Sequence, residues 1–372
     1  MISLVVALVV AYAILILYYS LNFRESTNSY DTSEQCSFSI IIPYRNEERY
    51  LPELLRCIEH LNYPSKLIEV ILIDDGSKDK SKAICQAWKT KNPGLDISLL
   101  DNLNLARSPK KSAILTGLQK VKSKYILTTD ADCLVPQSWL AQYNKHMLKS
   151  SSDLSAGPVK IIEDSKFWTR FQVLDLMSLQ VIGLGSFNTG SALFCNAANM
   201  CYNTQALKEI QAFSGHRDII SGDDVFNLEV FQETGKKVSA LVHKDACVKT
   251  KAETNFNALT QQRIRWASKA KYYKSIWIKV LGLVVLLTNI CLICTLALAI
   301  IFRDFYDYWW LLWIVKLGID YFSLSVGNKF FETNLHLKDY LIMLMIYPFV
   351  SSYFAILGIK GTFFWKGRSF KD

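Results

Sequence analysis

The sequence predicts an α/β domain, built on a parallel sheet, between apolar ends that cross a membrane. Between Phe38 and Asp132, short apolar strand-like segments alternate with helix-like segments, which is the pattern of parallel strands joined by crossover helices. Hydrophobic residues make up 51% of the 372 residues and charged residues only 20%, and the apolar excess is concentrated at the two ends. This distribution is typical of a membrane protein with a soluble middle.

The first element, residues 2–21, is predicted to be an apolar helix that crosses the bilayer. It contains no charged residue, and a span needs about 20 residues. A cleaved signal peptide is the alternative, but it would begin with basic residues and end with small ones. This segment has no Lys or Arg before it and ends near Tyr18 and Tyr19. We therefore expect an uncleaved anchor over residues 1–23.

The soluble middle is predicted from its alternating strand and helix patterns. We expect strands at 38–42, where Pro43 stops the run, and at 70–73, 97–100 and 125–127, with helices at 51–61, 81–88 and 113–121. Ligands of such sheets bind at the carboxyl ends of the strands. Two acidic pairs fall there, Asp74 with Asp75 and Asp130 with Asp132. Asp also caps helices and begins turns, but two pairs at strand ends favour a binding site.

The Asp130-Ala131-Asp132 triplet has the chemistry of a divalent-cation site. Two carboxylates two residues apart let one bind the ion while the other binds its water shell or a ribose. Magnesium and manganese prefer oxygen ligands and share them with substrate phosphates. The position of the triplet directly after a predicted strand strengthens this interpretation.

A later acidic turn, Gly222-Asp223-Asp224, precedes an apolar segment that is predicted to be a helix. Asp224 could be a helix cap and nothing more. It could also be a general base, because a carboxylate beside a metal-bound diphosphate can take the proton of an acceptor hydroxyl.

Gln262, Arg265 and Trp266 are spaced to share one face of a helix. They offer an amide, a permanent cation with a planar donor fork, and an aromatic platform. Such a face suits a diphosphate leaving group beside a sugar acceptor. Anchoring of the helix at a membrane surface by Trp266 and its basic neighbours is an equal alternative.

The aromatic and aliphatic residues between Phe167 and Met177 could form an amphipathic helix on a membrane surface. Core packing is the more frequent explanation of such a stripe. Beyond them, Val280–Phe302 is an uncharged apolar run, and 309–326 and 340–357 are weaker candidates, since the former contains charges and the latter a proline. Charges inside a span are costly unless they face protein or water. We therefore expect two or three spans within residues 276–372.

Positive charge predicts the orientation. The residues before Val280 include four lysines, Lys269, Lys271, Lys274 and Lys279. Because basic residues flanking a span favour the cytoplasmic side, the middle domain should be cytoplasmic. If all three C-terminal candidates crossed, the basic tail would lie outside, so we expect one of them not to cross; the segment around Pro348 could be re-entrant or interfacial.

Charge and cysteine content narrow the partners further. The 42 Lys and Arg against 33 Asp and Glu give a formal charge of +9, which suits nucleic acid, anionic lipid or phosphorylated substrates. The membrane spans favour lipid headgroups, and no nucleic-acid-binding motif is recognisable, so we expect no nucleic-acid partner. The nine cysteines show no paired metal spacing. Reduced thiols, rather than a zinc or disulfide framework, are expected.

In their order along the chain, these motifs resemble those of processive and lipid-directed family 2 glycosyltransferases. The resemblance covers about residues 38–270, and its segments are Ile41-Ile42-Pro43-Tyr44-Arg45-Asn46-Glu47-Glu48, Ile73-Asp74-Asp75-Gly76-Ser77, Asp130-Ala131-Asp132, Gly222-Asp223-Asp224 and Gln262-x-x-Arg265-Trp266. It implies a GT-A-like, Rossmann-type nucleotide-sugar domain over residues 36–275, with transmembrane helices on both sides.

The resemblance also implies residue roles. The early Asp pair would lie beside the uracil and ribose, Asp130 and Asp132 would bind the metal and diphosphate, and Asp224 would be the catalytic base. The implied donor-binding residues are Pro43, Asn46, Glu47, Asp74, Asp75, Lys110, Asp130, Gln262, Arg265 and Trp266. Lys110 resembles the lysine of a Gly-Lys-x-x-Ala element, with Pro109 in place of the glycine. Residues 195–199 resemble an acceptor-side Cys-Asn-Gly-Ala-Asn element, with Ala197 in place of the glycine.

We therefore expect a membrane-anchored inverting glycosyltransferase that depends on Mg²⁺ or Mn²⁺. Its donor would be a nucleotide sugar, most commonly UDP-sugar in the family it resembles, and its acceptor a lipid or a lipid-linked glycan at the cell membrane. The alternatives are a processive polysaccharide synthase subunit and a catalytically inactive membrane scaffold. With at most three C-terminal spans there is little material for a polymer channel, so single transfer is preferred.

Overall fold

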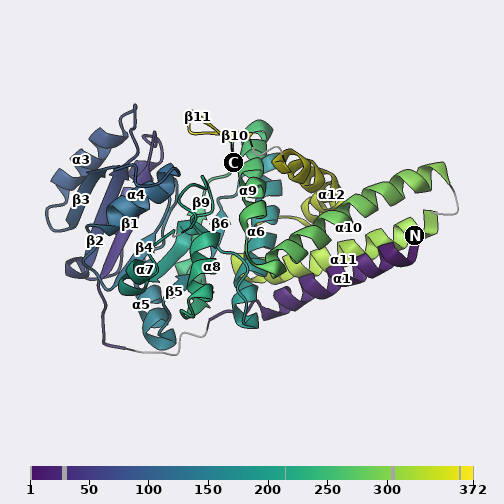
Figure 1. Ribbon diagram of the computed structural model, residues 1–372, viewed down its shortest axis with the longest axis horizontal. Helices are drawn as coiled ribbons and strands as arrows, with labels where there is room; N and C mark the ends of the chain where they lie inside the picture. Colours follow the sequence, from purple (N-terminus) through teal and green to yellow (C-terminus); the bar gives the residue numbers. More distant parts are fainter. Residues whose placement is uncertain (1, 27–31, 214, 303–305, 360–361, 372) are drawn as a thin grey trace. The chain divides into compact units, whose positions relative to one another are not determined.

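The computed structural model describes residues 2–26, 32–213, 215–302, 306–359 and 362–371 (Figure 1). The chain forms two compact units, and each contains segments that are distant in sequence. The sheet unit comprises Arg24–Ile162 and Phe194–Lys251; the helical unit comprises Met1–Phe23, Glu163–Leu193 and Ala252–Asp372.

A seven-stranded sheet forms the centre of the sheet unit. Its strands, in spatial order, are β3 (Asp96–Asp101), β2 (Ile68–Asp74), β1 (Phe38–Tyr44), β4 (Tyr125–Thr128), β7 (Met200–Asn203), β5 (Leu154–Ala156) and β8 (Val238–Ala240). All neighbouring pairs are parallel except those that involve β7. The predicted α/β fold with a parallel sheet is therefore confirmed.

The central strands form because their apolar runs are buried on both faces, as parallel sheets require. All seven residues of β2 are buried, and in β1 Ile40 pairs with Val70 on one side and with Leu127 on the other. Strand β1 does not stop at Pro43, as the sequence suggested, but continues to Tyr44. The pairing of β4 with β1 ends at Ile41, so beyond that point β1 has one neighbour and the missing N–H of proline is tolerated.

Helices cover the sheet (Figure 1). They are α2 (Leu51–Glu59), α3 (Ser81–Lys91), α4 (Pro109–Leu118), α5 (Trp139–Ser150), α7 (Thr204–Glu209) and α8 (Val225–Glu233). Helix α4 begins four residues earlier than predicted, because Ser108 caps it by accepting a hydrogen bond from the amide of Lys111 and Pro109 suits the first helical position. A separate two-stranded sheet pairs β6 (Val159–Ile161) with β9 (Val248–Thr250).

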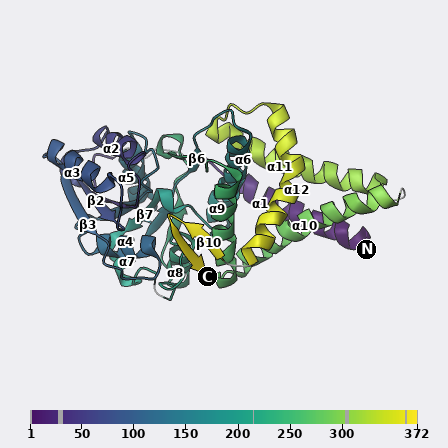
Figure 2. The same ribbon diagram turned by 90° about the horizontal axis from the view of Figure 1, so that it is seen from above.

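The helical unit contains the predicted apolar segments as long helices (Figure 2). Its elements are α1 (Ile2–Asn22), α6 (Phe167–Ser186), α9 (Phe256–Ser268), α10 (Ile276–Ile301), α11 (Tyr306–Phe331), α12 (Leu337–Ile359) and the hairpin of β10 (Thr362–Trp365) with β11 (Arg368–Lys371). By length and composition, four of the described helices could cross a membrane: α1, α10, α11 and α12.

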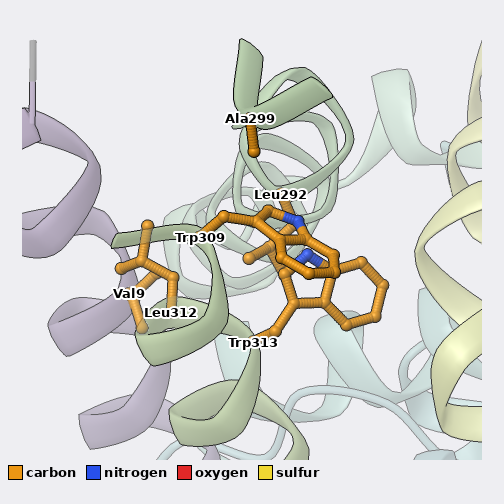
Figure 3. Close-up of a cluster of buried hydrophobic side chains, with 6 residues drawn as sticks. All are labelled: Val9, Leu292, Ala299, Trp309, Leu312 and Trp313. Atoms are coloured by element: carbon orange, nitrogen blue, oxygen red, sulfur yellow. The ribbon is translucent and has the colours of Figure 1, made fainter. Parts of the chain in front are cut away.

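Close packing joins these helices. Buried side chains of α1, α10 and α11 form the apolar cluster of Figure 3, which comprises Val9, Leu292, Ala299, Trp309, Leu312 and Trp313. Helix α6 approaches α1 so closely that a Cβ at Gly185 would lie 2.2 Å from the carbonyl oxygen of Tyr19. Phe171, Leu174 and Met177 of α6 are buried, so core packing explains this part of the aromatic and aliphatic stripe, whereas Phe167 at the start of the helix is exposed.

Candidate active site

The candidate site is built at the carboxyl ends of the parallel strands β1, β2, β3 and β4. Because these strands run in the same direction, the segments that follow them meet at one edge of the sheet. The first acidic pair lies here. Asp74 is the last residue of β2 and is buried, and its Oδ1 accepts a hydrogen bond of 2.9 Å from the amide of Ser77. Its carboxylate therefore shapes the turn that follows β2.

Asp75 is held from two sides. Its Oδ1 accepts a hydrogen bond of 2.8 Å from Nδ2 of Asn102, which follows β3, and its Oδ2 lies 3.8 Å from Nη1 of Arg45, which follows β1. Only a tenth of its side chain is exposed. The positive φ of Gly76 (73°) continues this turn, a conformation that suits glycine. The carboxylate is thus fixed at the sheet edge where the sequence predicts nucleoside binding.

Asn46 and Glu47 join the loops after β1 and β2. Asn46 has a positive φ of 53°; its amide donates to Oγ of Ser77 (3.1 Å), and its Oδ1 accepts from the amide of Lys78 (2.8 Å). The amide of Glu47 donates to Oγ of Ser81 (2.8 Å). These contacts give both residues a structural role in rigidifying the loop. Their predicted donor-binding role, like that of Pro43 in β1, stays a prediction.

Lys110, at the start of α4, joins two acidic motifs that lie far apart in sequence. Its Nζ lies 2.6 Å from Oδ1 of Asp130 and 3.1 Å from Oδ2 of Asp223. Burial alone would lower the pKa of Lys110, but the charges and hydrogen bonds of the two carboxylates outweigh it and raise the pKa above its ordinary value. The ammonium is therefore positive at neutral pH and partly neutralises the acidic site.

Asp130 and Asp132 offer the oxygen atoms of a divalent-cation site. With Cys133 they form a group whose potential ligand atoms all lie within 4.8 Å of one another. Burial, followed by the charges of the two aspartates, raises the pKa of the Cys133 thiol well above its ordinary value. Magnesium and manganese prefer oxygen to sulfur ligands, so the donors expected for them here are the two carboxylates. This oxygen set fits Mg²⁺ or Mn²⁺ with substrate phosphates completing the coordination.

Asp224 begins α8 and lies next to Asp223, the partner of Lys110. Its Oδ1 accepts a hydrogen bond of 2.7 Å from the amide of Val225, and the preceding Gly222 has a positive φ of 81°. The carboxylate is partly exposed. The helix-capping role is therefore present in the structure, and the role of Asp224 in proton transfer stays a prediction.

Lys111 supports the segment that leads to this turn, a role that the sequence did not reveal. It is fully buried, and its Nζ donates to the carbonyl oxygens of His216 and Ile219, each at 2.9 Å. The ammonium also lies 4.8 Å from the ring centroid of Phe226, the second residue of α8. Consecutive lysines at the start of α4 thus serve different ends: Lys110 holds the carboxylates, and Lys111 holds the backbone.

Asn199, in the segment that resembles an acceptor-side element, is a buried structural hub. Its Nδ2 donates to the carbonyl oxygens of Pro158 (2.8 Å) and Ala246 (2.9 Å), and its Oδ1 accepts from Nε1 of Trp139 (2.8 Å) and from the hydroxyl of Tyr143 (3.0 Å). With every polar atom of its amide in use, Asn199 fixes the strands around it and is not available to an acceptor.

Gln262, Arg265 and Trp266 lie on α9 of the helical unit. Nε2 of Gln262 donates to Oε1 of Glu253 at 2.9 Å. Trp266 carries the guanidinium of Arg263 over its ring, 4.1 Å from the centroid. Arg263 was not singled out from the sequence, although it is the buried arginine of this helix. The donor-binding role of the three predicted residues stays a prediction.

Comparison with known proteins decides the family. The profile of "Glycosyl transferase family 2" matches residues 39–210, and that of "Glycosyl transferase family group 2" matches residues 125–323, which is more than half of the chain. The chain belongs to the family 2 glycosyltransferases. The resemblance drawn from the sequence motifs is confirmed.

The curated relatives match part of the chain. An "undecaprenyl-phosphate 4-deoxy-4-formamido-L-arabinose transferase" of Pseudomonas savastanoi pv. phaseolicola is 36% identical over 102 residues, 26% of this chain and 28% of that relative. "Glycosyltransferase AglE" of Haloferax volcanii is 24% identical over 195 residues, 50% of this chain and 58% of that relative. The chain thus spans less than two thirds of the length of these relatives.

A solved structure shares the fold over nearly the whole chain. The "mannosyltransferase PcManGT from Pyrobaculum calidifontis in complex with GDP-Man and Mn2+" matches with a TM-score of 0.56 and 14% identity, covering 96% of each chain. The predicted fold class, a GT-A-like nucleotide-sugar domain with apolar helices at both ends, is confirmed.

Proposed function

We propose that the protein is a membrane-anchored inverting glycosyltransferase that moves a sugar from a nucleotide-sugar donor to a lipid or lipid-linked acceptor. The observation that carries this proposal is the contact of Lys110 with both Asp130 and Asp223. That contact brings the Asp-x-Asp triplet and the turn of Asp224 together, so that a group for the leaving diphosphate and a group for the acceptor lie on one edge of the sheet.

The donor-binding residues are proposed from their positions at the sheet edge. Asp74 and Asp75, at the end of β2, would contact the nucleoside. Asp130 and Asp132 would hold a divalent ion. Such an ion would supply positive charge to the diphosphate as it departs. Lys110 adds a second cation, so removal of the metal should weaken donor binding but leave this local charge. We propose a UDP-sugar as donor, in keeping with the sequence resemblance.

Asp224 is proposed to act on the acceptor. Its carboxylate takes the proton of an acceptor hydroxyl while the hydroxyl oxygen forms a bond to the anomeric carbon. The bond from that carbon to the diphosphate oxygen breaks, the nucleoside diphosphate leaves with the bonding electrons, and the configuration inverts. Gln262, Arg265 and Trp266 are proposed to contact the diphosphate and the acceptor. Gln262 and Arg265 supply hydrogen-bond donors for the diphosphate, and Trp266 supplies an aromatic platform for the acceptor sugar.

The relatives favour a second acceptor class. The name of the Pseudomonas relative includes undecaprenyl phosphate. An acceptor of this kind would attack through a phosphate oxygen that is already ionised at neutral pH. Such an acceptor needs no general base. A hydroxyl acceptor and a phosphate acceptor therefore differ in their dependence on Asp224, and this difference separates the two candidates experimentally.

The test is a transfer assay with the full chain in membranes. Labelled nucleotide sugars are offered with either polyprenyl phosphate or a lipid-linked glycan, and label in the lipid extract is measured with manganese, with magnesium and with excess chelator. We expect metal-dependent transfer to one acceptor class. Transfer in excess chelator would contradict the metal site, and absence of both transfer and donor hydrolysis would favour the inactive scaffold.

A further inference from the structure

Two buried ion pairs lie inside the helical unit. Nζ of Lys316 lies 2.5 Å from Oδ2 of Asp320 one turn along α11, and Nη2 of Arg263 on α9 lies 2.5 Å from Oδ2 of Asp175 on α6. None of the four side chains is more than 10% exposed. Tyr12 of α1 also donates a hydrogen bond to Asp320. Buried charges are costly unless they are paired, and such pairs are weak evidence for a gain in stability.

Tyr347 of α12 is a common neighbour of the two pairs. The Nζ atom of Lys316 lies 5.3 Å from the centroid of its ring. Tyr347 also interacts electrostatically with Asp175, Asp320 and Arg263. Tyr347 thus lies beside Lys316 of one pair and interacts with Asp175 and Arg263 of the other. We treat the two pairs as one network, with charges from α6, α9 and α11.

The network is electrically balanced, with two cations and two carboxylates. In an apolar interior, removal of one charged side chain leaves a net buried charge. The remaining charged groups must then move to compensate for it. Removal of a cation together with a carboxylate keeps the balance, and replacement of a whole buried pair by uncharged residues is often tolerated. A single substitution should therefore disturb the network, whereas a paired substitution should be tolerated. This contrast makes the network testable.

Arg263 connects the network to the Gln-x-x-Arg-Trp face of α9. Its Nη1 donates to Oε1 of Gln262 at 3.1 Å, and its guanidinium lies 4.1 Å from the ring centroid of Trp266. Nε2 of Gln262 donates in turn to Glu253. Two of the three predicted functional side chains of α9 are therefore oriented by a guanidinium that Asp175 holds in place.

We propose that Asp175 is a positioning residue, which holds Arg263 so that Gln262 and Trp266 keep their orientation on α9. The Lys316–Asp320 pair maintains the charge balance that keeps Asp175 on Arg263, so the interior of the helix bundle affects the face of α9. The proposal rests on the proposed function for its effect on turnover, but the orientation of α9 can be measured without turnover.

Hydrogen–deuterium exchange of the full chain in nanodiscs tests the orientation. Asp175→Asn should raise the exchange rates of the α9 amides about tenfold or more, because local opening becomes easier, and should leave the amides of β1 and β2 unchanged. Asp164→Asn is the matched control, since Asp164 belongs to the same unit and its pair with Lys166 is largely exposed. Unchanged exchange in α9 would overturn the proposal, whether or not the protein transfers sugar.

Turnover and nucleotide binding test the consequence. Asp175→Asn should lower kcat by up to about 10²-fold, the effect of a misplacement of about 1 Å, and should also weaken nucleotide binding, because Gln262 is proposed to contact the diphosphate. Asp320→Asn should act in the same direction, and Lys316→Met combined with Asp320→Asn should restore kcat to within about threefold of wild type. Failure of the paired variant to recover while its unfolding midpoint stays normal would overturn the charge-balance step.

The two proposals fail separately. Increased exchange of α9 in Asp175→Asn without transfer by the wild type from any donor would leave the positioning role standing and remove the proposed function. Transfer by the wild type together with full kcat in Asp175→Asn would leave the proposed function standing and remove the positioning role.

Discussion

Asp224 combines two tasks that a single substitution can separate. One carboxylate oxygen caps α8 through the amide of Val225, and asparagine caps helices about as well as aspartate. Asp224→Asn should therefore fold normally and bind nucleotide near wild-type affinity. With a hydroxyl acceptor its turnover should fall by about 10²–10⁴, the usual contribution of a positioned general base. Steady-state transfer assays and nucleotide titration provide the measurement.

The control for this prediction is Asp79→Asn. Asp79 also accepts a hydrogen bond from an amide near a helix start, that of Ser81 at 3.0 Å, but no catalytic role is proposed for it. If Asp224→Asn kept most of its turnover with a hydroxyl acceptor, Asp224 would not be the base and Asp223 would be the next candidate. Retained turnover with polyprenyl phosphate alone would identify a phosphate acceptor.

At the scale of single residues, the sequence predicts the acidic site better than its supports. Asp74, Asp75, Asp130 and Asp132 could be located because strand ends meet at one edge of a parallel sheet. The contact between Lys110 and Asp223 could not be predicted, since it joins residues more than a hundred positions apart. Lys111 carried no signal either, because a buried lysine that binds backbone carbonyls has the same sequence pattern as an exposed one.

His146 makes the contact of α5 with β8 dependent on pH. Its Nε2 lies 2.7 Å from Oγ of Ser239, and burial, with a smaller contribution from the charge of Lys149, lowers the pKa of His146 from 6.5 to about 4. Below pH 6.5 the unfolded chain binds a proton that the folded chain excludes. The contribution to folding is therefore complete above about pH 6.5 and is lost as the pH falls toward 4.

We expect this loss to reach about 3 kcal/mol, at about 1.4 kcal/mol per pH unit. His146→Gln should have a shallower fall in its urea unfolding midpoint between pH 6.5 and 4.5 than the wild type. His60→Gln, at an exposed histidine, controls for the loss of an imidazole. Parallel pH profiles of the wild type and His146→Gln would contradict the assignment.

Helix α12 packs against α9 through a glycine. A Cβ at Gly358 would lie 2.4 Å from Cβ of Ala267, the neighbour of Trp266 on α9. Gly358→Ala should therefore separate the two helices, and overpacking of this kind costs about 1–3 kcal/mol. We expect a lower thermal unfolding midpoint in detergent and slower transfer.

The same substitution at Gly318 provides the control, because nothing lies within 4 Å of a Cβ there. Gly318→Ala should be neutral or stabilising by up to about 1 kcal/mol, since alanine favours the helix. Combining Ala267→Gly with Gly358→Ala should recover part of the loss. Equal midpoints for Gly358→Ala and the wild type would show that the helices do not pack as described.

At the scale of elements, length decides what the sequence predicts. The long apolar helices and the strands β1 to β3, of six or seven residues, are long enough for their periodicity to be read. Strand β4 has only four residues, but it lies just before the acidic triplet. Strands β5, β7 and β8 have three or four residues each, and their pairing depends on distant segments. Their addition beyond β4, including the antiparallel β7, could therefore not be predicted from local pattern.

At the scale of the molecule, the contacts within the helical unit bear on how the chain crosses the membrane. The ring centroid of Phe23, directly after α1, lies 5.4 Å from that of Phe330 near the C-terminus of α11. The C-terminal ends of α1 and α11 therefore lie side by side. The amide of Phe364, beyond α12, donates to Oε1 of Gln261 on α9 at 2.9 Å. Because α9 precedes α10 along the chain, we expect the chain before and after α12 to lie on one side of the membrane.

Helix α12 should therefore be the C-terminal candidate that does not cross. The first turn of α12 supports the same conclusion. Oδ1 of Asp339 lies 2.6 Å from Nη1 of Arg170 on α6, which belongs to the segment between α1 and α10. An interfacial α12 leaves three crossings, by α1, α10 and α11. The basic tail with Lys366 and Arg368 then lies on the same side as the sheet unit, which satisfies the charge rule that three C-terminal crossings would break.

Thiol labelling tests both the orientation and the crossing of α12. With the exposed Cys294 replaced by serine, an impermeant maleimide should label Phe302→Cys, at the end of α10, in intact cells. Lys91→Cys in the sheet unit and Lys366→Cys in the tail should be labelled only after permeabilisation, because both are expected on the cytoplasmic side. Labelling of Lys366→Cys from outside, with Lys91→Cys protected, would mean that α12 crosses; labelling of Lys91→Cys from outside would reverse the orientation.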